Sequence, residues 1–338
     1  MTTWHTLWDA RPGWLNTASY GLPPRQAYTE LQTVLDQWRH GSSDWKPWDD
    51  SVGRARTAFA HLIGAPSADI TISSTASQIT STIATALPER ARVLVPDIEF
   101  TSNVFPWAVA ADVQTAPADR LAEHITPATT AVAFSLVQSA TGERAPLADI
   151  IAAARQHDTL VIADASQACG WLPITPDGID ALVCAAYKWL MAPRGAAFGY
   201  LSPRLRERMR PLAANWYSAP DPDPDTAFYG MPLRVAGDAR AFDLSPAWFC
   251  YVGAAPALEL LATLGVQAVG AHNLALADHV RAGLGLPPGD SPILSLEADP
   301  ARLAAAGITA ATRAGRARLS FHAYNTLADA ERALEALS

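Results

Sequence analysis

The sequence of 338 residues predicts an α/β protein, with a mostly parallel sheet between helices and a small α+β domain at the C-terminus. Between about residues 54 and 201, short and continuously apolar runs alternate with Ala-rich segments of helical length. Strands that are apolar on both faces and separated by helices are typical of parallel sheets. The alternation stops at residues 218–232, where four prolines predict a loop. Shorter strand-like and helix-like segments follow.

The expected strands of the large sheet lie at residues 69–73, 92–96, 130–137, 159–164, 180–186 and 196–201. One helix is expected to begin at Thr75–Ser77, and another after Pro146, which suits a first helical turn. A long helix is expected at 245–265. Strands at 291–298 and 316–321 and helices at 300–307 and 327–337 make up the small domain. We expect residues 22–236 to form the large domain, and residues 1–21 with 237–338 to form the small one.

The composition narrows the class of protein. Apolar residues make up 49% of the chain, charged residues 17%, and the net charge is −8, as expected for a packed globular protein. No Lys/Arg block alternates with aromatic residues, so no nucleic-acid partner is expected. The most apolar long segment, 247–258, is too short for a bilayer, so no membrane association is expected. The N-terminus does not resemble a secretion signal, and the three cysteines are widely spaced. These features predict a cytoplasmic protein without disulfides or metal.

Lys188 is one of only two lysines, and it lies in the otherwise apolar stretch "VCAAYKWLMAPRG". A desolvated lysine can lose its proton and become a nucleophile that forms a Schiff base, which an arginine cannot do. The alternative is a structural lysine whose ammonium group reaches water. Asp164 ends an expected strand 24 residues earlier (188 − 164 = 24), so both side chains are expected at one edge of the sheet. Asp164 alone could equally cap the next turn.

Four stretches of the sequence resemble motifs of one known family. "VIADASQACGWLPI…DALVCAAYKWLMAPRGAAFGYL" resembles the signature of the class V aminotransferases, which are pyridoxal-phosphate enzymes of fold type I. "LNTASYGLPP", "EFTSNVFPW" and "RLSFHAYNT" resemble further motifs of that family in the same order. The family includes cysteine desulfurases, kynureninase, isopenicillin N epimerase and ergothioneine-pathway C–S lyases. The resemblance covers nearly the whole chain and implies pyridoxal phosphate, an amino-acid substrate and a homodimer.

The resemblance also implies roles for single residues around the cofactor ring and the substrate. Lys188 would hold the cofactor as a Schiff base, and Asp164 would pair with its pyridinium nitrogen. Gln167 would donate a hydrogen bond to the phenolic oxygen of the ring. Arg318 would bind the substrate α-carboxylate, with Asn16 nearby. An ordinary structural arginine on a strand is the alternative for Arg318.

Other residues would hold the cofactor's ring face and phosphate. Phe100 occupies the position of the family's stacking residue. Ser74 and Thr75, in "SSTASQ", would bind the phosphate at a helix start, although an ordinary Ser/Thr cap fits the same pattern. Tyr187 replaces the family's commoner histidine and would assist. Ser245 would reach the phosphate of a neighbouring subunit.

The expected reaction is C–S β-elimination or transamination of a bulky amino acid or conjugate. The short small domain leaves little room for a lid, which suits a bulky substrate. The stretch at 218–242 could form part of the mouth, with Trp216, Tyr217, Tyr229 and Arg234 as possible contacts, or it could be a structural loop with buried aromatic residues. An epimerase and a catalytically silent protein are the alternatives. A cysteine desulfurase is not expected, because residues 292–318 contain no cysteine to carry a persulfide.

Overall fold

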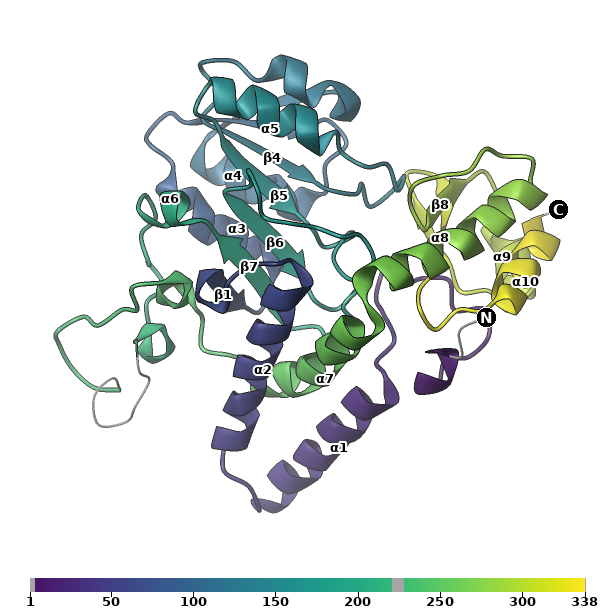
Figure 1. The fold of residues 1–338 in the computed structure, drawn as a ribbon, viewed down its shortest axis with the longest axis horizontal. Coiled ribbons are helices and arrows are strands. Elements are labelled where there is room, and N and C mark those ends of the chain that lie inside the picture. The colour runs from purple at the N-terminus through teal and green to yellow at the C-terminus, as the bar shows by residue number, and fades with distance from the viewer. Residues whose placement is uncertain (1–3, 221–227, 338) are drawn as a thin grey trace.

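The computed structural model describes residues 4–220 and 228–337. Its main feature is a seven-stranded sheet in the order β1-β7-β6-β5-β4-β2-β3 (Figure 1). β7 runs antiparallel to both β6 and β1, and the other neighbouring pairs are parallel. The strands are β1 (Ile70–Ser73), β2 (Arg92–Pro96), β3 (Asp112–Ala116), β4 (Ala131–Ser135), β5 (Leu160–Asp164), β6 (Ala181–Ala185) and β7 (Ala197–Leu201). The predicted fold class is confirmed.

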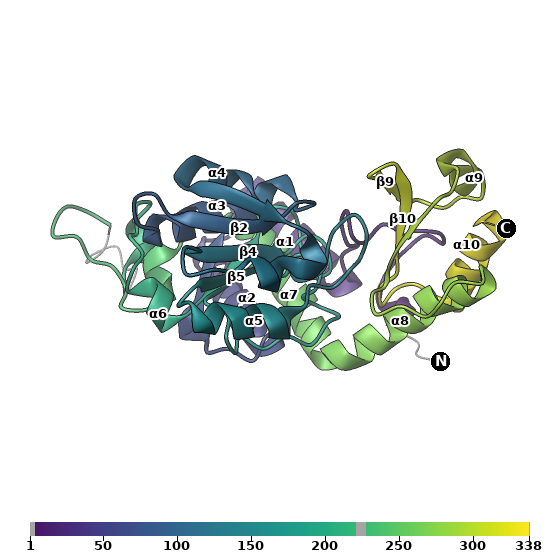
Figure 2. The same ribbon diagram turned by 90° about the horizontal axis from the view of Figure 1, so that it is seen from above.

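Helices cover both faces of this sheet (Figure 2). Successive side chains of each strand point to opposite faces, so each strand contributes to two cores. On β4, Val132 and Phe134 pack in one core with α2 (Lys46–Leu62), α5 (Leu147–Gln156) and α7 (Trp248–Leu264). Ala131 and Ala133 face a second core with α3 (Ala76–Ile83) and α4 (Phe105–Ala110). Two further helices are α1 (Arg25–His40) and α6 (Pro203–Arg206). The expectation of a sheet buried on both faces is therefore correct.

The C-terminal part contains a three-stranded antiparallel sheet in the order β8-β10-β9. Its strands are β8 (Ile293–Leu296), β9 (Ala311–Arg313) and β10 (Arg316–Ser320), and its helices are α8 (Val266–Gly283), α9 (Pro300–Ala305) and α10 (Leu327–Leu337). The N-terminal segment joins this sheet through a bridge between Asn16 and Ser320. Residues 15–16 and 318–320, far apart in sequence, therefore lie side by side.

The two parts meet where α7 and α8 bend by 83° at Gly265, whose φ of 82° suits glycine. α7 packs against α1 and α2, whereas α8 packs against α10. The domain boundaries at residues 21/22 and 236/237 remain predictions. Within the described residues, no single helix is long and apolar enough to cross a bilayer, although the bent α7–α8 pair is, by length and composition.

Candidate active site

The carboxyl ends of β1, β5 and β6 surround a cavity of about 110 Å³ that contains Lys188. In parallel α/β sheets this edge is the usual position of a ligand site. The cavity is lined by Ser74, Thr75, Ala76, Ser77, Phe100, Ser102, Asp164, Ser166, Ala185, Tyr187, Lys188, Arg194 and Ala196. Six of the residues that the sequence singles out therefore lie together: Ser74, Thr75, Phe100, Asp164, Tyr187 and Lys188.

Lys188 lies in the loop after β6 and is only 8% exposed. The N-terminal segment closes over this loop, because the Gly21 amide donates to the Tyr187 carbonyl at 2.9 Å. A Cβ atom on Gly21 would lie 2.1 Å from the Lys188 carbonyl oxygen, so only glycine fits there. Burial lowers the pKa of Lys188 below that of a free lysine, although Asp164 partly opposes the effect. A larger fraction of Lys188 is therefore in the neutral, nucleophilic form than is the case for a surface lysine.

Asp164 is the last residue of β5, and its side chain accepts a hydrogen bond from the Ser166 amide at 2.7 Å. It thus makes the local cap that the sequence allows and also lines the Lys188 cavity. Both interpretations of Asp164 are compatible, because a carboxylate has two oxygens that accept hydrogen bonds.

Ser74, Thr75 and Ser77 lie at the N-terminus of α3, on the same cavity wall. Thr75 caps this helix: its Oγ1 accepts from the Gln78 amide at 3.3 Å, and Gln78 Oε1 accepts from the Thr75 amide at 3.1 Å. A capped helix start presents hydroxyls and backbone N–H groups to an anion. Ser77 was not predicted, although it belongs to the same "SSTASQ" stretch.

Phe100 is held at the cavity by the residue before it. The Glu99 carboxylate accepts hydrogen bonds from the Phe100 amide at 2.6 Å, the Ser135 amide at 2.6 Å and the Ser135 hydroxyl at 2.7 Å. Burial raises the pKa of Glu99, and the bonds from Ser135 and Phe100 oppose that rise. The Phe100 ring lies with its centroid 5.5 Å from Lys188 Nζ. Glu99 is not among the site residues predicted from the sequence, although it opens the "EFTSNVFPW" motif.

Gln167 does not line the cavity, in contrast to the other residues predicted to surround the cofactor ring. Its side-chain amide donates to the Ala18 carbonyl at 3.0 Å, and its Oε1 accepts from Trp189 Nε1 at 2.7 Å. Ser166 lines the cavity at this point instead. A contact between Gln167 and the phenolic oxygen remains a prediction, and the second N–H of the side-chain amide is not used by either of these bonds.

Arg318 is 1% exposed, and no carboxylate forms an ion pair with it within the described residues. Its Nη1 donates to the Ser139 carbonyl at 2.5 Å and its Nη2 to Ser19 Oγ at 2.8 Å, while Nε has no partner. Burial lowers its pKa to about 10. The buried Oδ1 of Asn16 also has no partner. A buried cation without a counterion is costly unless an anionic ligand completes it.

Two predictions concern residues outside the cavity lining. Ser245 is exposed, and the Leu244 amide bonds to the Ile72 carbonyl at 3.2 Å, which places Ser245 beside β1. Its contact with a second subunit is untested. Trp216 packs edge-on against Trp45 and Tyr217, so it belongs to an aromatic cluster and not to the wall of the Lys188 cavity. Residues 221–227 of the adjoining loop lie outside the described residues.

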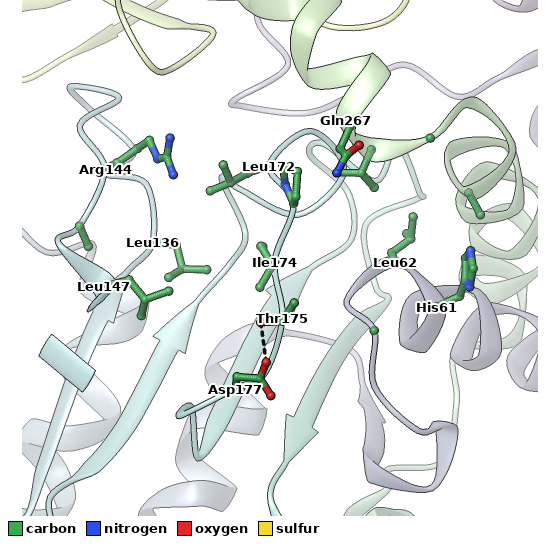
Figure 3. A pocket seen from close by; sticks show the side chains of 16 residues that line it. His61, Leu62, Leu136, Arg144, Leu147, Leu172, Ile174, Thr175, Asp177 and Gln267 are labelled. Atoms are coloured by element: carbon green, nitrogen blue, oxygen red, sulfur yellow. Dashed lines mark hydrogen bonds between the residues drawn. The ribbon is translucent and has the colours of Figure 1, made fainter. Parts of the chain in front are cut away.

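A larger cavity, of about 580 Å³, lies away from Lys188, beside the α7–α8 bend (Figure 3). Its walls are mainly apolar, with Leu62, Leu136 and Ile174 among them. The polar side chains on its wall are spread out, and Thr175 and Asp177 bond to each other at 3.3 Å. It lacks the combination of buried lysine, carboxylate and helix start that the smaller cavity has. The smaller cavity is therefore the candidate site.

Comparison with known proteins shows the family of the chain. The family model for "Aminotransferase class-V" matches residues 39–290, about three quarters of the chain. The chain belongs to the class V aminotransferase family. The predicted family is thus confirmed, and so is pyridoxal phosphate, the cofactor of this family.

Individual curated relatives share about a quarter of their aligned residues with this chain. The uncharacterized aminotransferase YcbU of Bacillus subtilis is 25% identical over 256 residues, covering 72% of this chain and 67% of the relative. Isopenicillin N epimerase of Streptomyces clavuligerus is 26% identical over 315 residues, covering 83% of this chain and 78% of the epimerase. These identities do not determine which reaction this class V enzyme catalyses.

Solved structures share the fold. The cystine C–S lyase C-DES superposes with a TM-score of 0.85 at 19% identity, covering 97% of each chain. The cysteine desulfurase CsdA of Escherichia coli superposes with a TM-score of 0.83 at 20% identity, covering 98% of this chain and 96% of CsdA. Because desulfurases share this fold, the expectation that this chain is not a desulfurase remains a prediction.

Proposed function

We propose that this class V enzyme is a lyase that cleaves a carbon–sulfur bond in a bulky amino acid or conjugate by β-elimination. The observation that carries the proposal is the buried Lys188 in one cavity with Asp164, next to the uncompensated Arg318. This cavity and its surroundings offer binding groups for the cofactor's phosphate, for its ring and for the amino-acid substrate.

The residues present fit pyridoxal phosphate. Lys188 would hold the group covalently, and Asp164 would face its ring nitrogen. The start of α3, with Ser74 and Thr75, would take the phosphate, assisted by Tyr187. The ring of Phe100, beside Lys188 Nζ, would cover one face.

The α-carboxylate of the amino acid would bind to the Arg318 guanidinium and supply its missing counterion. The guanidinium has a free Nε, and Asn16 Oδ1 is a free acceptor for the α-amino group or for water. This anchor would orient the substrate, so that its Cα proton faces Lys188. Arg318 would thus fix which bond lies in the reactive position.

When bound, pyridoxal phosphate supplies an electron sink that stabilises negative charge at Cα of the amino acid. Lys188 Nζ would accept the Cα proton, and burial lowers its pKa toward the range of a working base. The Cβ–S bond would then break, and the sulfur would leave with the electron pair as a thiolate. Hydrolysis of the remaining enamine yields pyruvate and ammonia.

The supply of acid and base groups favours a sulfur leaving group. Among the described residues on the cavity wall, the titratable side chains are Asp164, Tyr187, Lys188 and Arg194. Burial lowers the pKa of Lys188 toward neutrality. A thiolate leaves without protonation, because the pKa of a thiol is about 8.5. One base is therefore sufficient for the elimination.

Transamination is the second candidate, because Lys188 could pass the proton taken from Cα to the cofactor carbon bonded to the substrate nitrogen, on the same side. An epimerase requires proton delivery to the opposite face of Cα, for which the described cavity wall offers Tyr187 and Arg194 besides Lys188 and Asp164. A silent protein would have no use for a buried, uncompensated Arg318.

A persulfide-forming desulfurase is not proposed. Cys169 and Cys184 are buried, and Cys250 donates from its Sγ to the Arg194 carbonyl at 3.3 Å. None of the three lines the described wall of the Lys188 cavity. We also propose a cytoplasmic homodimer, as the family resemblance implies, in which Ser245 of one subunit contacts the phosphate site of the other.

Product analysis tests the reaction. The cofactor-loaded protein is incubated with S-substituted L-cysteines and with common L-amino acids, and pyruvate and ammonia are measured. Equal amounts of pyruvate and thiol are expected for an S-substituted cysteine. Conversion of the cofactor to its amine form without pyruvate would make the chain an aminotransferase, and Cα–deuterium exchange without net product would make it an epimerase.

A further inference from the structure

A second cavity, of about 390 Å³, adjoins the Lys188 cavity. It lies between the start of α1 and the loop that carries Lys188, and apolar parts of Tyr20, Ala27, Tyr28, Leu31, Met191 and Pro193 line it. Its volume falls within the range of about 300–1,000 Å³ that is usual for small-molecule sites.

This cavity shares part of its wall with the proposed reaction site. Tyr187 and Arg194 line both cavities. Ser19 lines the second cavity and also accepts the hydrogen bond from Arg318 at 2.8 Å. The second cavity thus borders the anchor proposed for the α-carboxylate and the residue next to Lys188. The second cavity is therefore the neighbouring space into which the side chain of an anchored amino acid could extend.

The walls of the second cavity are fixed by close backbone contacts. Gly21 packs against Met191, whose Cγ would lie 2.9 Å from a Cβ atom at Gly21. Gly253 packs against Pro193, whose Cγ would lie 2.6 Å from a Cβ atom at Gly253. Such contacts leave little freedom to collapse the space, so its shape is preformed.

Charge is confined to one side of the second cavity. Arg194 is the only charged residue on its described wall, and it lies at the boundary shared with the Lys188 cavity. The Arg194 guanidinium carbon lies 5.2 Å from the centroid of the Tyr187 ring. Beyond that boundary the wall consists mainly of aromatic rings and aliphatic groups, with the hydroxyls of Tyr20 and Tyr28 as polar groups and no charged side chain, and it favours an apolar side chain.

We infer that the second cavity receives the side chain of the substrate, and that the substrate is an L-amino acid or S-substituted cysteine with a large apolar or aromatic group. This inference rests on the proposed function, because it uses Arg318 and Lys188 as the anchors of the amino acid. Leu31 is the residue best suited to limit the size of that group. It lies on α1, and its Cδ2 atom would lie 3.8 Å from a Cβ atom at Gly253, across from Pro193.

The test compares S-benzyl-L-cysteine with S-methyl-L-cysteine, with binding measured by the change in the visible spectrum of the bound cofactor. The benzyl compound is expected to bind at least about tenfold more tightly, because its ring becomes buried. In Leu31→Trp, which fills the cavity, this ratio is expected to fall to roughly threefold or less, with unchanged binding of the methyl compound. Gln32→Trp, at an exposed neighbour on α1, is the matched control and is expected to keep the ratio.

The outcomes are distinguishable. Equal binding of the two compounds, or an unchanged ratio in Leu31→Trp, would overturn the inference while the proposed function stands. The absence of any Lys188-dependent cofactor band would refute the proposed function, and with it this inference. Thermal unfolding and the cofactor band of Leu31→Trp before ligand addition show whether the variant is folded.

Discussion

Arg318 is the residue whose surroundings most clearly require a ligand. It is buried, it donates to Ser139 and Ser19, and it has no carboxylate partner within residues 4–220 and 228–337. Replacement by Gln removes the charge but keeps part of the hydrogen bonding. We expect Arg318→Gln to bind L-phenylalanine about 30-fold more weakly, or roughly 2 kcal/mol, and phenethylamine as the native protein does. Phenethylamine lacks the α-carboxylate, so it is the matched ligand.

The measurement is a spectroscopic titration of the cofactor-loaded protein with each ligand. An equal loss of affinity for the acid and the amine would show that Arg318 acts structurally. Arg318→Lys is expected to recover only part of the loss, because an ammonium cannot form the two parallel bonds of a guanidinium.

Glu99 is expected to act as a positioning residue for Phe100. Its two oxygens accept three hydrogen bonds from Phe100 and Ser135, so an amide at this position must place its NH₂ group against a donor. We expect Glu99→Gln to bind pyridoxal phosphate about tenfold more weakly and to lose most of the visible circular dichroism of the bound cofactor.

Ser135→Ala is the control for Glu99, because it removes only the hydroxyl bond and is expected to have a smaller effect on both readouts. If Glu99→Gln lowers the thermal stability but leaves the dichroic band of bound cofactor unchanged, the carboxylate does not orient Phe100.

At the scale of residues, strand-end chemistry was predictable and side-chain orientation was not. Asp164 and Lys188 follow apolar strands in one sheet, so their meeting at one edge follows from the pattern. Gln167 has the expected position in the chain, but its amide turns to Ala18 and Trp189, which are remote in sequence or on another loop. No local sequence pattern predicts this direction of the Gln167 side chain. Glu99 was detectable only as part of a motif.

At the scale of elements, the small domain is tied to the Lys188 loop through a buried histidine. His322 Nε2 lies 2.9 Å from the Trp189 carbonyl, and Nδ1 lies 3.1 Å from Asn273 Nδ2 on α8. The carbonyl requires a proton on Nε2, and Nδ1 then accepts from the amide. Burial lowers the pKa of His322 to about 3. The histidine is therefore neutral in the folded protein.

This neutral histidine makes stability depend on pH. In the unfolded chain His322 has a pKa of about 6.5, so between about pH 6.5 and 3 the unfolded chain binds a proton that the folded protein does not. The free energy of unfolding is therefore expected to fall as pH decreases, by at most about 1.4 kcal/mol per pH unit from this residue. His322→Gln removes the effect.

The check is urea unfolding at pH 7 and pH 5 for both proteins. We expect the native protein to lose more stability than His322→Gln over this interval. Equal losses in the two proteins would show that another group causes the acid sensitivity.

The elements also show what sequence patterns miss. The six strands expected in the large sheet are present within two residues of their observed ends. β3 was not predicted, because it is an edge strand and its sequence "DVQTA" is polar and largely exposed. β9 has only three residues, of which two are exposed. Long apolar strands are detectable, whereas short edge strands depend on a neighbour for their hydrogen bonds.

At the scale of the whole molecule, an exposed apolar stripe on α4 lies close in sequence to Phe100. Phe105 and Val109 are four residues apart on one helix face and are 63% and 90% exposed. Large exposed apolar groups often mark a protein interface. We expect Val109→Asp to weaken the proposed homodimer by at least about tenfold in dissociation constant. Leu212→Asp, at an exposed apolar residue outside α4, is expected to leave the dissociation constant unchanged.

Sedimentation equilibrium of the two variants and the native protein is the corresponding measurement. A monomeric native protein, or a dimer that Val109→Asp does not weaken, would contradict the assignment of α4 to the interface. The sequence alone could not predict this surface, because exposure of Val109 follows from how α4 lies on the sheet.

The central claim is that the buried Lys188 holds pyridoxal phosphate, and the visible spectrum tests it most directly. The purified protein is mixed with the cofactor beside Lys188→Ala and Lys46→Ala, the latter being the matched control at the other lysine. We expect an absorption band of the lysine-bound cofactor in the native protein and in Lys46→Ala, which borohydride reduction makes permanent on the peptide containing Lys188. No such band, or an equal band in Lys188→Ala, would contradict the account.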